Sequence, residues 1–424
     1  MSLDIPLNLK NMKVVFVPNY FYLNIPIFEP IITQLSEKGI TSYVLRLPGN
    51  TDIPADRDFD LNYFKSRGIN FIEVPIFRLP YYKNRIFSKF KLLNIAFRNW
   101  KIVRTSLKEV NPDTVVVGSD LGSLNIRFLM DACYSSRIPV VILYSCDLPK
   151  LNARAAFRFF YSWRNRYILK LRIISFFRAL LFTGTIPGEY ALDSTICVAS
   201  EEICKKLVAK GISRKRIIVT GMPFPTFPIS SSSEGTFKKL GIPQDYKLII
   251  LFTECIQHIY GTEYAKDLFI KLSQMVKILP NDIFFLIKLH PLESKEMEIF
   301  IKDIFNDKPR CKIITNFSVE ELIGVASLCI AHFSRVLITA ALMHKRFLSI
   351  NLMKDRKRTF ISGEEAEILE VNSFEDLERK IEEALENPEF GENIDKVVTG
   401  IANRFSSADS YEKIISAILN SAQH

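Results

Sequence analysis

The stretch DIFFLIKLHP, residues 282–291, carries the clearest fold signal in the chain. A run of large apolar residues ends at Lys288 and His290, and Pro291 then prevents the strand from continuing. Uninterrupted apolar runs of this length are typical of strands buried on both faces of a parallel sheet. Ligands of such sheets bind beyond the carboxyl ends of the strands, so Lys288, His290 and Pro291 lie at a predicted binding edge.

The sequence on both sides of this strand repeats the same rhythm. Towards the amino terminus, buried runs alternate with amphipathic helices from MKVVFVPNY at residues 12–20 onwards. Towards the carboxyl terminus, the runs RCKIITN, LCIAHFS and RFLSINL alternate with helices as far as FEDLERKIEEALE at residues 374–386. Strands that alternate with helices predict parallel sheets with crossover helices. We therefore predict an α/β fold with two Rossmann-like parallel-sheet lobes facing a cleft.

One segment interrupts the rhythm and predicts the domain boundary. Residues 222–235, MPFPTFPISSSSEG, are rich in Pro and Ser, which is typical of a linker. The chain is also too long for one ordinary core. We predict an N-terminal domain at 1–221, a C-terminal domain at 236–408, and a last helix at 409–424 that packs back on the first domain.

Composition and short motifs exclude several classes of protein. Hydrophobic residues make up 48% and charged residues 24%, which indicates a folded chain. The seven cysteines lack zinc-site spacing and are interpreted as reduced thiols of a cytosolic protein. Neither a signal peptide nor a membrane-spanning run is recognisable. The loop PNYFYLNIP after the first strand has no glycine, which argues against dinucleotide chemistry. We expect neither a cofactor nor a bound metal.

The C-terminal half offers further anion-binding candidates. In residues 328–352 a strand passes through a short polar turn into a helix, and Ser334 falls at the helix N-cap, directly before Arg335. Free backbone N–H groups at such a helix start bind phosphate. Thr253 and Glu254 end the strand YKLIILFTE and complete the predicted donor site. An ordinary capping serine is the alternative for Ser334.

Two acidic residues in the N-terminal half are candidates for a general base. Asp120 lies in GSDLGS after the strand TVVV, and Asp147 ends the next strand, VVILYSCD. A carboxylate at a strand end can take a proton from an acceptor hydroxyl. The alternative for each is an aspartate that caps a turn.

Charge is unevenly distributed along the chain. Residues 1–228 hold 32 Lys and Arg against 17 Asp and Glu, whereas residues 229–424 hold 24 against 29. Two acid-free segments, 74–108 and 148–188, interleave basic with aromatic residues, as in helices that lie on anionic membranes. A helix-packing surface or nucleic acid is the alternative, but no nucleic-acid module is recognisable. The predicted membrane-inserting residues are Phe159, Phe160, Trp163, Phe176 and Phe177.

The C-terminal half resembles GT-B glycosyltransferases, in particular bacterial sialyltransferases and capsule-polysaccharide transferases with an HP motif and a Ser/Thr motif. His290-Pro291 matches the first motif and Ser334 the second. The resemblance implies that both contact the phosphate of a nucleotide sugar, which serves as substrate. The acidic motif of these families is absent, and only Ser119-Asp120-Leu121-Gly122 stands in a comparable place.

The whole chain also resembles the UDP-N-acetylglucosamine 2-epimerase group. VVVGSDLGS and IPVVILYSCD lie like its two acidic strand ends, and FISGEEAEILEV at residues 360–371 would place Glu364 or Glu365 near a ribose. Its His-Arg-x-Glu-Asn stretch is replaced by FTECIQHIYG, with only His258 nearby.

We therefore expect a metal-independent glycosyltransferase that moves a sugar from a nucleotide sugar to a lipid-linked or surface-glycan acceptor. It would be cytoplasmic and peripheral at the inner face of the cell membrane. An epimerase-like enzyme and a non-catalytic sugar-nucleotide or lipid-binding scaffold are the alternatives.

Overall fold

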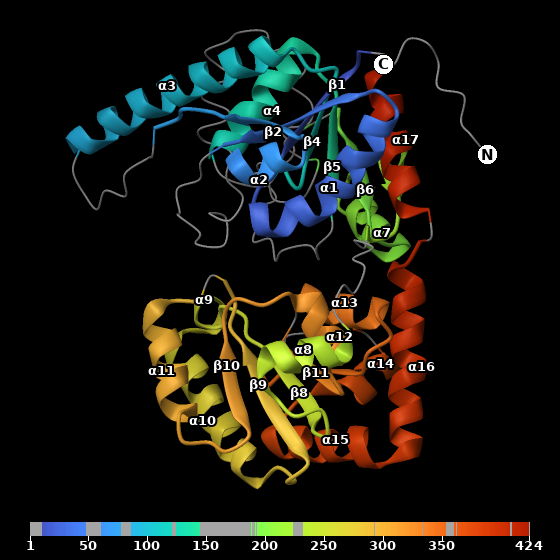
Figure 1. Ribbon diagram of the computed structural model, residues 1–424. Coiled ribbons are helices and arrows are strands. Elements are labelled where there is room, and N and C mark those ends of the chain that lie inside the picture. Colours follow the sequence, from blue (N-terminus) through green and yellow to red (C-terminus); the bar gives the residue numbers. More distant parts are fainter. Residues whose placement is uncertain are drawn as a thin grey trace. The chain divides into compact units, whose positions relative to one another are not determined.

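The computed structural model divides the chain into two compact units. The first unit comprises residues 1–225 and 407–424, and the second unit comprises residues 226–406 (Figure 1). Each unit is described by itself. The structure describes residues 11–47, 61–77, 86–120, 124–144, 188, 191, 193–223, 232–291, 293–332, 334–352, 360–361, 363–407 and 409–423.

The first unit is a parallel sheet covered by helices. Its elements are β1 (Lys13–Val17), α1 (Phe21–Glu37), β2 (Thr41–Arg46), α2 (Leu61–Ser66), β3 (Asn70–Glu73), α3 (Ile86–Val110), β4 (Thr114–Val117), α4 (Leu124–Ser136), β5 (Val140–Tyr144), β6 (Thr195–Val198), α7 (Glu201–Ala209), the 3-10 turn Arg214–Arg216, β7 (Ile217–Val219) and α17 (Ser410–Ala422).

The seven strands lie in the order β3-β2-β1-β4-β5-β6-β7, and every pairing is parallel. Every residue of β4 and β5 is buried, as the apolar runs TVVV and VVILY predict. The sheet grows in one direction from β1 to β3 and in the other from β4 to β7. The gap between the carboxyl ends of β1 and β4 is therefore the switch point of this sheet.

The second unit has the same architecture. Its elements are α8 (Ser233–Leu240), β8 (Lys247–Phe252), α9 (Gln257–Tyr260), α10 (Thr262–Ile278), β9 (Ile283–Lys288), α11 (Lys295–Phe305), β10 (Cys311–Ile314), α12 (Val319–Val325), β11 (Leu328–Ala331), α13 (Arg335–Leu342), β12 (Phe347–Ile350), α14 (Glu364–Leu369), β13 (Glu370–Val371), α15 (Phe374–Glu386) and α16 (Pro388–Phe405).

Its six strands are also all parallel, in the order β10-β9-β8-β11-β12-β13. This repeats the strand order of the first sheet, and the switch point lies between β8 and β11. Two Rossmann-like parallel-sheet units confirm the predicted fold class, which is that of the GT-B type.

The last helix of the chain lies in the first unit. Ile414, Ile415 and Ile418 of α17 are buried in the same apolar cluster as Phe16 of β1 and Phe28 of α1. The division between the units falls after Pro225, within the Pro- and Ser-rich stretch. The first unit is therefore built from two stretches of chain that the second unit separates in sequence.

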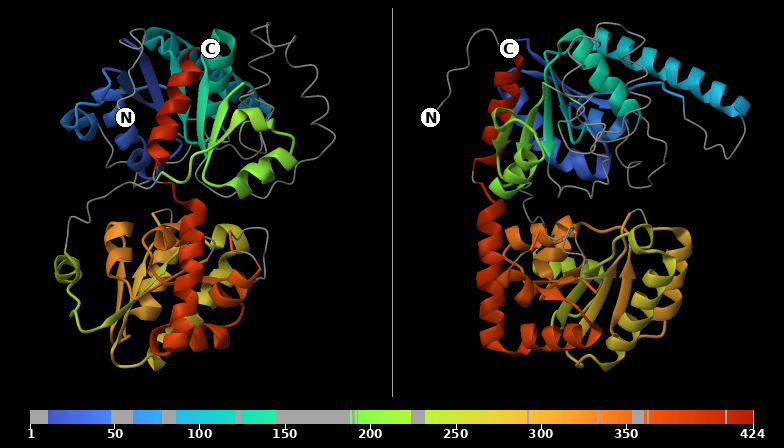
Figure 2. Two further views of the ribbon diagram at one scale, coloured as in Figure 1. Left: turned by 90° about the vertical axis from the view of Figure 1, so that its right-hand side faces the viewer. Right: turned by 180° about the vertical axis from the view of Figure 1, so that it is seen from behind.

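Among the described residues of the first unit, α3 is the longest helix, with 25 residues. Its later turns pack on α4, and its early turns extend beyond α4 (Figures 1 and 2). Asn99 is fully buried, and its amide pairs with both the N–H and the C=O of Phe77, at 2.8 and 2.7 Å. Trp100 donates from Nε1 to Asp131 of α4 at 3.3 Å.

In the part of the chain that the structure describes, no helix combines the length and the apolar character needed to cross a bilayer. No three metal-ligating side chains of the described residues gather in one place. Six described cysteines are free thiols.

Candidate functional site

The carboxyl edge of the second sheet brings together most of the predicted donor residues. Thr253 follows β8, Lys288 ends β9, and His332 follows β11, the strand on the other side of the switch point. Phe252 pairs with Lys288 across β8 and β9, while Leu251 pairs with Ile330 of β11. The parallel register therefore places three polar strand ends in one row.

Thr253 locks the turn that carries His290. Its hydroxyl accepts from the backbone N–H of His290 at 2.8 Å and donates to Glu293 Oε2 at 3.0 Å. Glu293 in turn donates its backbone N–H to the carbonyl of His290 at 3.0 Å. Pro291 lies inside this closed turn, where its missing N–H costs nothing. Thr253 therefore acts as a support for His290 rather than as an isolated donor ligand.

The imidazole of His290 contacts the thiol of Cys255, with 3.3 Å between Nδ1 and Sγ. Burial, and secondly the charge of Lys288, lower the pKa of His290 to about 4. Burial, and then the charges of Glu293 and Glu254, raise the pKa of Cys255 to about 12. Both groups are therefore neutral near pH 7.

The structure corrects the predicted role of Lys288. Its side chain is buried, and Nζ donates to the carbonyls of Leu289 at 2.9 Å and Thr315 at 2.6 Å. Burial lowers the pKa of this ammonium to about 8. Lys288 therefore ties β9 to the loop after β10 instead of reaching out to a phosphate, because the strand end turns the side chain inward.

Helix α13 begins at the same edge, as the sequence predicts. Ser334 is its N-cap, and its hydroxyl accepts from the N–H of Val336 at 3.2 Å. Arg335 is the first helical residue and is partly buried. His332 is 3% exposed, and its Nε2 has no hydrogen-bond partner among the described residues. Burial lowers the pKa of His332 to about 3, so this ring is also neutral.

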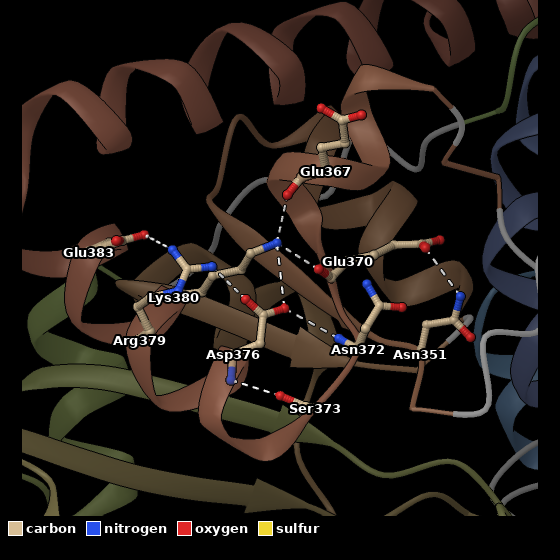
Figure 3. Close-up of polar contacts among 9 residues, drawn as sticks. All are labelled: Asn351, Glu367, Glu370, Asn372, Ser373, Asp376, Arg379, Lys380 and Glu383. Carbon is tan, nitrogen blue, oxygen red and sulfur yellow. Dashed lines mark hydrogen bonds and ion pairs between the residues drawn. The ribbon is translucent and has the colours of Figure 1, made fainter.

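A polar network joins the last two strands of this sheet, β12 and β13, to α15 (Figure 3). Asn351 follows β12 and donates from Nδ2 to Oε2 of Glu370, which is buried in β13, at 3.1 Å. Lys380 of α15 is buried and donates to the carbonyls of Glu367 and Glu370, at 2.7 and 2.6 Å. Its ammonium also lies 3.8 Å from Asp376. This network holds the short edge strand β13 against α15.

The structure also corrects the predicted ribose contact. Glu365 forms a two-oxygen ion pair with Arg404 of α16, each contact at 3.1 Å. Glu364 is exposed at the start of α14. Glu365 therefore fastens α14 to α16, because the helix directs its side chain to α16 and away from the strand ends.

In the first unit, Asp120 does not present its carboxylate to an acceptor. The side chain is fully buried and accepts from the backbone N–H groups of Gly188, at 3.0 and 3.1 Å, and of Ala191, at 3.1 Å. Arg216 donates to the carbonyls of the same two residues, at 2.9 and 2.6 Å. Asp120 therefore anchors a chain segment in this structure, and the observed contacts do not support its predicted role as general base.

The switch point of the first sheet is occupied by amide side chains. Asn24 Oδ1 accepts from the N–H groups of Asn19 and Tyr20, at 2.9 and 3.2 Å. Asn19 Oδ1 accepts from the N–H of Ser119 at 2.8 Å. Gly118 makes room for this arrangement, because a Cβ there would lie 2.8 Å from Cγ of Asn24.

Other predicted residues cannot be placed. Asp147, Phe159, Phe160, Trp163, Phe176 and Phe177 lie outside the described residues. Glu254 is partly buried next to Cys255.

Comparison with solved structures gives the same architecture over nearly the whole chain. The UDP-N-acetylglucosamine 2-epimerase of Neisseria meningitidis bound to UDP-GlcNAc has a TM-score of 0.63 at 15% identity, covering 96% of this chain and 100% of that one. The chain has the fold of this enzyme. The 2-epimerase of Rickettsia bellii gives 0.60 at 14%, covering 97% of each chain. A UDP-glucosyltransferase of Polygonum tinctorium gives 0.62 at 11%, covering 98% and 99%. No family model and no curated protein matches the sequence.

Sequence reasoning missed four polar residues of the second unit's edge: Cys255, His332, Asn351 and Glu370. Three of them could have been predicted by the rule applied to His290, which is that polar residues after a buried strand lie at the binding edge. His332 and Asn351 directly follow the apolar runs LCIA and FLSI, and Cys255 comes two residues before a helix. Glu370 could not be predicted from the sequence, because β13 has only two residues and gives no strand pattern.

Proposed function

We propose that the protein is a glycosyltransferase whose second unit binds a nucleotide sugar at the carboxyl edge of its sheet. The observation that carries the proposal is the start of α13, where Nε2 of buried His332 has no partner in the described part of the chain and lies two residues before the Ser334 cap. A helix start supplies backbone N–H donors and a positive dipole end, which suit a phosphate. The edge also lies at the switch point, where ligands of open α/β sheets bind.

In this proposal, α13 and the neutral ring of His290 bind the diphosphate. As the sugar leaves, negative charge develops on the departing phosphate oxygen, and fixed donors aimed at it stabilise the transition state. Lys288 contributes a positive charge behind His290 without touching the donor. This arrangement supports metal-independent transfer, which also agrees with the resemblance to HP-motif transferases.

The acceptor hydroxyl must lose a proton during transfer. Asp147 is the remaining sequence-based candidate for the base, since Asp120 is committed to backbone N–H groups. The acceptor proposed is a lipid-linked or surface glycan. An epimerase-like reaction ranks second, and the likeness to the Neisseria meningitidis enzyme supports it as a fold-level argument.

The test is a thermal-shift panel with CMP, CDP, UDP, GDP and TDP, followed by assays of nucleotide-sugar hydrolysis. A ligand at about 100 times its dissociation constant adds about 2.7 kcal/mol to the unfolding free energy. The His290→Ala variant should lose this shift while it keeps its own melting temperature. His344→Asn is a matched control, because His344 follows the far end of α13 with φ 53°, a conformation that Asn tolerates. Absence of any nucleotide shift in the wild type would refute the proposal, and binding without turnover would favour the scaffold.

A membrane surface is proposed as the partner of the first unit. On α3 an exposed face at helical spacing holds three basic residues and one acidic residue: it is formed by Asn94, Phe97, Arg98, Lys101, Thr105, Lys108 and Glu109. Lys101 lies 4.7 Å from the centre of the Phe97 ring, which stacks on Trp100 at 5.5 Å. This face is cationic and carries an aromatic ring, which suits anionic headgroups.

Vesicle sedimentation tests this surface. Each basic residue near an anionic surface contributes about 1 kcal/mol, so Lys101→Ala should weaken binding to anionic vesicles about fivefold. Lys205→Ala, an exposed lysine on α7 of the same unit, should leave it unchanged. Equal loss in both variants, or equal binding to neutral vesicles, would contradict a specific role for α3.

A further inference from the structure

Arg46 is the last residue of β2 and lies at the carboxyl edge of the first sheet. Strand β2 lies between β1 and the edge strand β3, where Arg46 pairs in register with Glu73. The Arg46 side chain is only 23% exposed, yet none of its N–H groups has a hydrogen-bond partner among the described residues. A guanidinium is a planar fork of N–H donors that keeps its charge in proteins. Arg46 therefore has donors left for a further partner.

Two neighbours fix the guanidinium without using these donors. Its Cζ lies 5.1 Å from the centre of the Phe21 ring of α1, a cation–π contact that uses no N–H group. Phe21 is itself buried, and its ring packs edge-on against those of Phe64 and Phe71, with 6.1 and 6.4 Å between ring centres. Glu73 Oε1 lies 3.9 Å from Arg46 Nε, which is too long for a hydrogen bond. The charge is thus held on an aromatic platform beside a loosely bound carboxylate.

We infer that Arg46 binds an oxyanion of the acceptor, namely the phosphodiester of a lipid-linked glycan or the carboxylate of an acidic glycan. The two groups share one chemistry, because each presents two oxygens with which the guanidinium forms parallel, charge-assisted hydrogen bonds. The side chain of Glu73 is 59% exposed, so an entering oxyanion displaces only a surface ion pair, which contributes little.

The place of Arg46 in the fold suits this role. Ligands of open α/β sheets bind beyond the carboxyl ends of the strands. At the neighbouring strand ends, Asn19, Asn24 and Asp120 accept from backbone N–H groups of the protein. Arg46 offers donors instead, at the same edge of the sheet. The oxyanion site is based on these contacts of the first unit, whereas the assignment of its ligand to the acceptor rests on the proposed function.

Titrations with dimethyl phosphate and with glucuronate, at constant ionic strength, test the site. They are followed by the NMR signal of the Arg46 Nε–H group, which is identified by its absence in Arg46→Lys. We expect a saturable shift with at least one of the two probes and none with neutral glucose, and the tighter probe identifies the class of oxyanion. Arg137→Asn is the matched control and should keep the affinity of the wild type. Arg137 is exposed, precedes β5 at the opposite edge of the sheet and has φ 57°, which Asn tolerates.

Two substitutions at the site should change the affinity in opposite directions. Glu73→Gln removes the competing carboxylate, so the affinity should rise about two- to fivefold. Arg46→Lys keeps the charge but loses the planar fork, so the affinity, followed on the backbone amide signals of β3, should fall about tenfold. An Arg46 signal that saturates with neither probe, or an Arg46→Lys variant that binds like the wild type, overturns the inference. If the signal saturates but no nucleotide binds the protein, the proposed function fails and the oxyanion site stands.

Discussion

The two sheets share one strand order but treat their switch points differently. In the first unit, the polar side chains that follow β1 and β4 bind backbone N–H groups of the protein. Asn24 and Asn19 accept from N–H groups of the two loops at these strand ends. Asp120 accepts from the N–H groups of Gly188 and Ala191. In the second unit, Thr253 follows β8, and the neutral imidazole of His332 and the start of α13 follow β11. Nε2 of His332 has no hydrogen-bond partner among the described residues.

The strand order determines where in the fold a ligand site can lie. The side chains at that edge determine whether their polar groups are left to bind a ligand or bind the protein itself. A buried polar group without a partner costs about 1 to 3 kcal/mol, so a fold retains one where a ligand can satisfy it. By this criterion the switch point of the first unit is a structural joint, where polar groups bind the protein itself, and that of the second unit is the candidate binding site.

The largest expected effect on stability comes from removing the contacts of Asp120 at the structural joint of the first unit. Asp120→Ala removes a buried carboxylate beside the half-buried Arg216 and should lower the unfolding free energy by about 3 to 5 kcal/mol, measured by urea denaturation. Asp113→Ala is the control, because its exposed carboxylate accepts from the N–H of Lys13 at 2.7 Å, and loss of that bond should cost about 1 kcal/mol. Full stability with lost turnover would return Asp120 to the role of a base.

A smaller effect is expected where the joint is tightly packed. Gly118→Ala forces a Cβ against the side chain of Asn24 and should cost about 1 to 3 kcal/mol in urea denaturation. Gly400→Ala, in α16 with open space around it, should instead stabilise the protein by about 1 kcal/mol. Equal effects of the two substitutions would mean that Asn24 can move aside without loss.

At the carboxyl edge of the second sheet, a substitution should affect nucleotide affinity rather than reduce stability. His332→Leu removes a buried nitrogen that has no partner among the described residues, so the unfolding free energy should stay constant or rise. The affinity for the nucleotide identified in the panel should fall about tenfold, which corresponds to about 1.4 kcal/mol. A variant that loses stability but binds normally would move His332 into the same structural class as Asp120.

The remaining expected effect concerns the pH dependence of stability. His290 and His332 have pKa values lowered to about 4 and 3, against about 6.5 in the unfolded chain. Between these values the unfolded chain binds more protons, so stability should fall as the pH decreases from about 6.5 towards 4. A series of melting temperatures should show a shallower slope in His332→Leu, whereas His344→Asn should keep the slope of the wild type. An unchanged slope in His332→Leu would mean that the ring is accessible to protons.

The sequence predicted the layers and most strands because buried parallel strands leave uninterrupted apolar runs. Helix α15 begins at Phe374 and ends at Glu386, as its amphipathic pattern predicts. Helix α1 runs from Phe21 to Glu37 and contains both Pro26 and Pro30, although proline is normally found at a helix start rather than inside. The location of His290 and the cap formed by Ser334 also followed from strand ends and capping preferences.

The direction of side chains did not follow from the sequence. Lys288, Asp120 and Glu365 all lie where a charged residue could serve a ligand, yet each binds the protein itself. Their partners are Thr315, Ala191 and Arg404, which are distant in sequence, so no local pattern could reveal these contacts. Residue type identified groups able to do chemistry, and only tertiary contacts decided which of them are already satisfied.

The placement of α17 has a consequence for the order of events during synthesis. The ribosome makes β1 before the second unit and α17 after it. Ile414 and Ile418 pack on an apolar surface of β1 and α1. This surface therefore stays exposed while the second unit is translated and folds. The first unit begins to form earlier but is completed later, and during that interval a chaperone has a natural place to bind.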